Sequence, residues 1–139
     1  MTTAAVIVAA GRGRRLGGAP KQYRPLAGET VLTRTLRGAL GSEAVDLVLV
    51  AIHSDDRAGY DAAVAPLADP RLLPPVAGGA ERADTVRLAL DALAPHAPAA
   101  VLVHDAARPF APRGMAGHAA RGEGPGRVVD QHRGGRVRR

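Results

Sequence analysis

A glycine-rich, cationic loop near the N-terminus is the first stretch whose residue types could do chemistry. It has the sequence AAGRGRRLG over residues 9–17 and continues with PKQ at positions 20–22. Glycines let the backbone approach a phosphate closely, and cationic side chains can stabilise charge that develops on a phosphoryl group. The loop is neither a P-loop nor a dinucleotide fingerprint, because Gly11, Gly13 and Gly17 miss the required spacing. By composition alone it could also be a solvated surface turn.

A second polar cluster, VHDAARP over residues 103–109, also follows an apolar run. Mg²⁺ prefers one or two carboxylates together with phosphate oxygens and water, which a lone Asp105 at a strand end can offer, although such an aspartate is also often a cap. His104 is expected to be packed or hydrogen-bonded, because no second metal-binding side chain lies at ligand spacing. Arg82 is expected to be a structural ion-pair partner.

The apolar patterns predict a parallel sheet that would bring these clusters together. Apolar runs indicate strands over 3–10, 45–52 and 99–103, and a short edge strand within 71–76 that is interrupted by two prolines. Helical spacing predicts helices over 31–40, from a Ser54 cap to about Leu67, and over 81–94. The alternation favours an α/β fold with a mostly parallel sheet flanked by helices. Ligands of such sheets bind beyond the carboxyl ends of the strands, where both clusters fall. This position favours the phosphate-binding interpretation of the loop.

Composition narrows the class of protein. The chain has 139 residues, of which 46% are hydrophobic, and this suffices for one globular domain with a core. It has no cysteine, which excludes a disulfide scaffold, a thiolate zinc site and a cysteine nucleophile. Its apolar runs are too short to span a bilayer and the N-terminus lacks the features of a signal peptide, so we expect a cytoplasmic protein without a membrane partner.

The net charge of +6 comes almost entirely from the last part of the chain. Residues 1–110 hold 12 Lys/Arg against 11 Asp/Glu, whereas residues 111–139 hold 7 Arg against 2 acidic residues. That basic segment has few branched aliphatic residues, so we expect it to be disordered. It also lacks aromatic residues that could stack on bases, which disfavours a nucleic-acid partner. Its composition would equally suit the translation of a reading frame lost near Ala111.

Three motifs in order resemble those of the 2-C-methyl-D-erythritol 4-phosphate cytidylyltransferases. They are the loop with its PKQ extension, GGAERADTV over 78–86 and VHDAARP over 103–109. The resemblance implies a Rossmann-like nucleotidyltransferase fold and Mg²⁺-dependent transfer of CMP from CTP to methylerythritol phosphate, with release of pyrophosphate. Ribitol 5-phosphate cytidylyltransferases share the nucleotide half, so ribitol 5-phosphate is an alternative substrate. An inactive nucleotide-binding fragment is a further alternative.

The resemblance also implies roles for individual residues. Arg15 and Lys21 would stabilise the transition state at the α-phosphate, Asp105 would hold Mg²⁺, and Arg108 would lie near the substrate. In the base-reading group, a serine is more usual in the family where Thr85 stands. The positions implied in nucleotide binding are Ala9, Ala10, Gly11 and Gly13 in the backbone cradle, Gly79, Ala80 and Thr85 at the cytosine, and Ala106.

The resemblance covers roughly residues 3–110, which are expected to form the nucleotide-binding part, with 111–139 a non-family basic tail. Members of the family are longer. Their second half binds the polyol phosphate, supplies another cation and carries an arm that joins two subunits. We therefore expect CTP and a small polyol phosphate as partners, and a family homodimer whose arm has no match in this chain.

Overall fold

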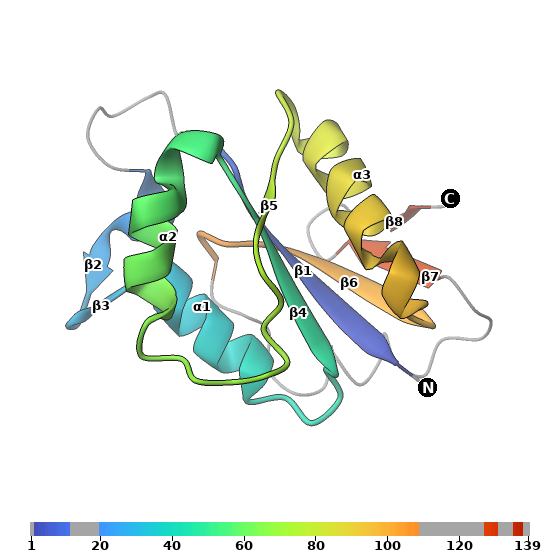
Figure 1. Cartoon of the computed structure of the whole chain (residues 1–139), viewed down its shortest axis with the longest axis horizontal. Coiled ribbons are helices and arrows are strands. Elements are labelled where there is room, and N and C mark those ends of the chain that lie inside the picture. Colours follow the sequence, from blue (N-terminus) through green and yellow to red (C-terminus); the bar gives the residue numbers. More distant parts are fainter. Residues whose placement is uncertain (1, 12–19, 109–126, 131–134, 138–139) are drawn as a thin grey trace.

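The protein is built around a six-stranded sheet with strand order β5-β4-β1-β6-β7-β8 (Figure 1). The computed structural model describes residues 2–11, 20–108, 127–130 and 135–137. Every pair of neighbouring strands is parallel except β7 with β8, which confirms the predicted mostly parallel sheet. The strands are β1 (Thr3–Ala9), β4 (Leu47–Ile52), β5 (Val76–Ala77), β6 (Ala100–Asp105), β7 (Arg127–Asp130) and β8 (Gly135–Val137).

Helices cover both faces of this sheet (Figure 1). The α-helices are α1 (Val31–Leu40), α2 (Arg57–Val64) and α3 (Arg82–Leu93). The 3₁₀ turn η1 (Lys21–Tyr23) lies between β1 and β2, η2 (Ser54–Asp56) joins β4 to α2, and η3 (Ala94–His96) joins α3 to β6. β2 (Pro25–Leu26) pairs with β3 (Glu29–Thr30) in a separate hairpin. The Thr30 hydroxyl caps α1 by accepting a hydrogen bond from the backbone N–H of Thr33 at 3.1 Å.

Alternating side chains of the central strand divide the core into two layers. Ala5 and Ile7 pack with Leu32 and Leu36 in a cluster that also takes in α2. Ala4 and Val6 point to the opposite face and pack with side chains of α3. Because both faces of β1 are covered, its residues form the continuous apolar run from which a buried strand was predicted.

The second helix differs from the prediction at both ends. His53, rather than Ser54, caps the first turn, because its Nδ1 atom accepts a hydrogen bond from the Asp55 N–H at 3.1 Å. A 3₁₀ turn then precedes α2, which begins at Arg57. The helix ends at Val64 instead of near Leu67, since Pro66 has no N–H to continue the hydrogen-bond ladder.

The predicted edge strand is interrupted at its prolines. Leu73 donates its N–H to Val48 O at 2.9 Å and Leu72 forms a bridge to the same residue of β4. Pro74 and Pro75 then leave the ladder, and β5 forms only at Val76–Ala77, on the edge of the sheet. β4 itself begins at Leu47, two residues after the predicted start at Val45.

The segment that we expected to be disordered contributes two strands. β7 pairs with β6 and β8 pairs with β7, so the expectation was wrong for these residues, while 109–126, 131–134 and 138–139 lie outside the described residues. Val128 is only 2% exposed and packs with the side chains of α3. The open edge of β6 supplies backbone partners that this short apolar stretch could not find by itself.

Candidate active site

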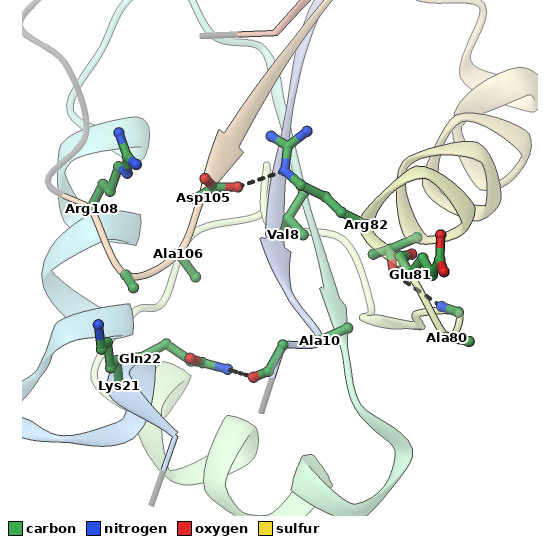
Figure 2. A pocket seen from close by; sticks show the side chains of 14 residues that line it. Val8, Ala10, Lys21, Gln22, Ala80, Glu81, Arg82, Asp105, Ala106 and Arg108 are labelled. Carbon is green, nitrogen blue, oxygen red and sulfur yellow. Dashed lines mark hydrogen bonds and ion pairs between the residues drawn. The ribbon is translucent and has the colours of Figure 1, made fainter. Parts of the chain in front are cut away.

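The polar clusters meet at the carboxyl ends of β1, β4 and β6. The Ala106 N–H donates to Val8 O at 2.9 Å, and the Gly78 N–H donates to Ile52 O at 2.8 Å. The segment after β6 therefore continues against the end of β1, and the segment after β5 continues against the end of β4. Between them lies an open cavity of about 340 Å³. Figure 2 shows Lys21, Ala106 and Arg108 on one side of it and Ala80, Glu81 and Arg82 on the other.

Gln22 anchors the start of the glycine-rich loop. Its side chain is buried, and its Nε2 atom donates to Ala9 O at 2.9 Å and to Gly11 O at 3.0 Å. These two bonds hold the backbone where it leaves β1 and set the position of the η1 turn. Lys21 precedes Gln22 in that turn, lines the cavity and is exposed. A single amide thus connects the backbone cradle with the lysine predicted to act on a phosphate.

The opposite wall depends on two glycines in close contact with neighbouring residues. A Cβ on Gly78 would lie 2.4 Å from the Ala10 Cβ atom, and one on Gly79 would lie 2.5 Å from the Asp84 Cβ atom. The buried Thr85 hydroxyl accepts from the Gly79 N–H at 3.0 Å and donates to Glu81 O at 3.2 Å. The Thr85 hydroxyl therefore holds the loop by two hydrogen bonds to the loop's backbone. The two glycines allow this loop to pack closely against Ala10 on one side and Asp84 on the other.

Two buried side chains hold the turn after β6. The Thr35 hydroxyl, on α1, lies 2.9 Å from Ala106 O and 3.2 Å from Arg108 O. His104 is 1% exposed, and its Nε2 atom lies 2.9 Å from the same Arg108 oxygen. His104 is therefore packed and hydrogen-bonded, as predicted, and among the described residues no group of three metal-binding side chains includes it.

Arg82 joins the ends of two strands. Its Nε atom donates to Asp105 Oδ1 at 3.0 Å, and its Nη1 and Nη2 atoms donate to the two oxygens of Asp130 at 2.5 and 3.0 Å. The prediction that Arg82 is an ion-pair partner is confirmed. Hydrogen bonding to Asp130 is the main cause that raises the pKa of the Arg82 guanidinium, and burial opposes it.

Most of the residues singled out from the sequence come together in this cavity. Ala9 is buried at the end of β1 and contributes its carbonyl to Gln22. Gly13 and Arg15 lie outside the described residues. The predicted residues that line the cavity are Ala10, Gly11, Lys21, Gly79, Ala80, Thr85, Asp105, Ala106 and Arg108.

Sequence reasoning missed the supporting residues. Gln22 was noticed only as part of a motif, while Thr35 and Asp130 were given no role. The internal threonine of an amphipathic helix was the available clue for Thr35, since a polar residue on a buried face needs a partner. For Asp130 no local pattern in the sequence points to Arg82.

Comparison of the sequence with a family model and with known proteins identifies one family. The family model described as "2-C-methyl-D-erythritol 4-phosphate cytidylyltransferase" matches residues 3–120, so the match continues beyond residue 110, where we expected it to stop. A bifunctional IspD/IspF enzyme of Paramagnetospirillum magneticum is 47% identical over 133 residues, which cover 95% of this chain and 32% of that protein. A 2-C-methyl-D-erythritol 4-phosphate cytidylyltransferase of Cereibacter sphaeroides is 48% identical over 116 residues, which cover 83% of this chain and 51% of that protein.

Solved structures show the same relationship. The 4-diphosphocytidyl-2C-methyl-D-erythritol synthase of Anaerococcus prevotii superimposes with a TM-score of 0.68 at 27% identity, over 82% of this chain and 47% of that one. Another structure of a synthase with that name gives a TM-score of 0.66 at 33% identity, over 81% and 50% of the two chains. This chain thus spans about half, or less, of the length of these relatives. With its three motifs around one cavity, the chain belongs to the 2-C-methyl-D-erythritol 4-phosphate cytidylyltransferase family.

Proposed function

We propose that this chain is the nucleotide-binding part of a cytidylyltransferase that transfers CMP from CTP to 2-C-methyl-D-erythritol 4-phosphate, giving CDP-methylerythritol and pyrophosphate. The observation that carries this proposal is the convergence of the three motifs on one cavity. The cavity lies beyond the carboxyl ends of parallel strands, where α/β sheets bind nucleotides. Both substrates are highly charged phosphates, so we place the reaction in the cytoplasm.

Transfer of a nucleotidyl group requires the protein to position the substrates and to stabilise charge, and it requires no covalent intermediate with the protein. An oxygen of the methylerythritol phosphate attacks the α-phosphate of CTP in line, the bond to the β-phosphate breaks, and pyrophosphate leaves. Lys21 stands at the edge of the cavity, where its ammonium group can follow the charge that grows on the α-phosphate. We assign the same task to Arg15, which belongs to the same loop of the sequence.

The wall that contains Gly79 and Ala80 suits recognition of the cytosine base. Thr85 holds the Gly79 N–H, and the neighbouring glycine is packed against Ala10. The loop backbone therefore presents its polar groups in fixed directions, which hydrogen bonding to the edge of a base requires. Ala10 and Gly11 present backbone without bulky side chains on the side where the triphosphate would lie.

The residues present fit a divalent cation. Asp105 lines the cavity, its side chain is 28% exposed, and the bond from Arg82 involves only its Oδ1 atom. One carboxylate, together with phosphate oxygens and water, is a donor set that Mg²⁺ accepts. We propose that Asp105 holds Mg²⁺ with CTP. When bound, Mg²⁺ would offset the negative charge of the triphosphate.

Arg108 is the candidate residue for binding the second substrate. Arg108 is exposed on the cavity side opposite Arg82 and can bind the phosphate of a small polyol phosphate. Ribitol 5-phosphate carries the same group. We further propose that the functional enzyme is a homodimer, as the resemblance implies.

A direct assay tests the assignment. The purified chain is supplied with CTP, MgCl₂ and methylerythritol phosphate, and pyrophosphate release is measured, with ribitol 5-phosphate in a parallel reaction. Release with methylerythritol phosphate supports the proposal, whereas release with ribitol 5-phosphate alone would reassign the substrate. CTP binding measured by calorimetry without any turnover would identify an inactive nucleotide-binding fragment. Absence of both binding and turnover would contradict the proposed function.

A further inference from the structure

The ion pairs of Arg82 connect a residue of the cavity with one that lies behind it. Asp105 and Arg82 line the cavity, whereas Asp130 is not among the lining residues described. The Asp130 side chain is 2% exposed, compared with 28% for Asp105 and 25% for Arg82. The three residues come from the end of β6, the start of α3 and the end of β7. Their contacts therefore join the carboxyl edge of the sheet to the helix that covers it.

The geometry of the contacts needs an arginine. Two N–H groups at the end of the guanidinium bind both oxygens of Asp130, and the Nε–H points to one oxygen of Asp105. A planar fork can make these three directed contacts at once, whereas the ammonium of a lysine is a point charge without that spread. Asp130 is the more buried partner, so it fixes the guanidinium, and the guanidinium in turn fixes Asp105.

Asp130 also balances the charge of this group. A single arginine beside Asp105 would neutralise the carboxylate and weaken its attraction for a cation. The two carboxylates share the guanidinium of Arg82, and the two-oxygen contact places most of its hydrogen bonding on Asp130 and not on Asp105. Asp105 is thus both oriented and left able to attract a cation in the cavity.

We propose that Arg82 is a positioning residue that, anchored by Asp130, orients the Asp105 carboxylate for a divalent cation bound together with CTP. The inference rests on the proposed function, because it takes Asp105 as the ligand. It gives β7, in the segment that sequence analysis set aside, a part in the nucleotide site. Residues that orient a metal ligand typically change metal affinity about 10- to 100-fold when they are replaced.

The test measures CTP binding by calorimetry at a series of MgCl₂ concentrations and in EDTA, on the full chain. Arg82→Lys keeps the charge but loses the fork, and Asp130→Asn removes the anchor from outside the cavity lining. Each is expected to raise the MgCl₂ concentration for half-maximal CTP binding about tenfold, while CTP affinity in EDTA stays within about a factor of two of wild type. Arg87→Lys, also on α3, is the matched control, because the Arg87 side chain is 71% exposed and its one ion pair among the described residues is with Asp84. This variant should behave as wild type.

A double-mutant comparison separates positioning from a merely structural role. In an Asp105→Asn background, Arg82→Lys should not shift the MgCl₂ dependence further, because the carboxylate that it orients is gone. If Arg82→Lys or Asp130→Asn lowers the melting temperature but leaves the MgCl₂ dependence of CTP binding unchanged, the ion pairs only fasten β7 to the sheet and the inference is overturned. A wild-type chain that binds CTP without any dependence on MgCl₂ would overturn it as well, and one that binds no CTP would contradict the proposed function itself.

Discussion

The hydroxyl oxygen of Thr35 lies 2.9 Å from the carbonyl oxygen of Ala106, although the two residues are 71 positions apart in the chain. The same hydroxyl is 3.2 Å from Arg108 O and 3.0 Å from Val31 O of its own helix. Thr35 is 1% exposed, and of its three acceptors Ala106 O lies in a buried contact, so its single proton is best used there. A buried hydroxyl on α1 thereby holds the turn that brings Ala106 and Arg108 to the cavity.

Replacement of Thr35 by valine should destabilise the protein and loosen this turn. Valine has nearly the same shape but no donor, so it removes the hydrogen bond to the carbonyl oxygen of the buried Ala106, at a cost of about 2 kcal/mol in the free energy of unfolding. Because Arg108 is carried by the turn, KM for the polyol phosphate should rise more than KM for CTP. Urea unfolding and steady-state kinetics measure the two effects.

Thr35→Ser is the matched control, because it keeps the hydroxyl and loses only a methyl group. It should retain most of the stability and KM for the polyol phosphate should change little. Equal losses in the serine and valine variants would show that packing, and not the hydrogen bond, is what this position contributes.

Lys21→Ala should lower the rate of pyrophosphate release about a hundredfold, which corresponds to the loss of one preorganised charge contact. CTP affinity should fall much less, since the proposed function assigns binding of the nucleotide to backbone groups of the loop and has the lysine stabilise charge that develops only in the transition state. Lys21→Arg should not restore the rate, because a planar fork differs in reach from an ammonium group. Single-turnover kinetics and calorimetry separate the two effects.

The control for Lys21 is Arg57→Ala, which removes an exposed cation of α2 that is paired with Asp61. Its turnover should match that of the wild type. A Lys21→Ala variant whose turnover stays within a factor of two would reduce the lysine to a solvated surface charge.

Two glycines of the cavity should respond differently to alanine. At Gly78 a new methyl group would lie 2.4 Å from the Ala10 Cβ atom and 2.8 Å from the Thr85 Oγ1 atom, whereas at Gly11 it would meet no atom of the described residues within 4 Å. Gly78→Ala is therefore expected to cost about 2 kcal/mol of stability through overpacking, and Gly11→Ala less than about 0.5 kcal/mol. Urea unfolding measures the free energy of unfolding of both variants. Equal values would contradict the close packing of the loop against the residue that follows β1.

Tyr60 should make the protein less stable in alkali. Burial raises the pKa of its phenol above the ordinary value of 10.0; the positive charge of Arg57 lowers this pKa to a smaller extent, and the negative charge of Asp61 raises it. The folded state thus holds the phenolic proton more tightly than the unfolded state, so the stabilisation is complete below pH 10 and is lost as the pH rises through the folded-state pKa.

This prediction is tested by urea unfolding between pH 8 and pH 11. The wild type should lose stability with pH more steeply than Tyr60→Phe, which has no phenol to ionise. Parallel curves for the two proteins would show that Tyr60 has the same pKa in both states.

Local patterns were sufficient for the central part of the fold. The apolar runs of β1, β4 and β6 and the helical spacing of α1 and α3 reflect burial that each segment carries in its own sequence. β7 could not be found in this way, because its few apolar residues become a strand only beside the open edge of β6. A prediction made segment by segment cannot include that partner.

The residues of the candidate site also differ in whether local sequence could identify them. Residues that line the cavity, such as Lys21 and Asp105, stood out by type and by their place after a strand. The partners that hold them act across long stretches of chain, since Arg82 is 23 residues from Asp105 and 48 from Asp130. Sequence spacing carries no trace of such contacts, and only the fold brings them together.

The strand order has a consequence for the nascent chain. β1 leaves the ribosome well before both of its neighbours, because Ala4 pairs with Leu47 on one side and with Val101 on the other. Until the second neighbour has been synthesised, a strand with apolar side chains on both faces keeps one hydrogen-bonding edge open. Such long-range pairing slows folding and exposes the polypeptide to aggregation. Arrested ribosomes that display fewer than the first 101 residues should therefore hold a chain that chaperones bind and proteases cut.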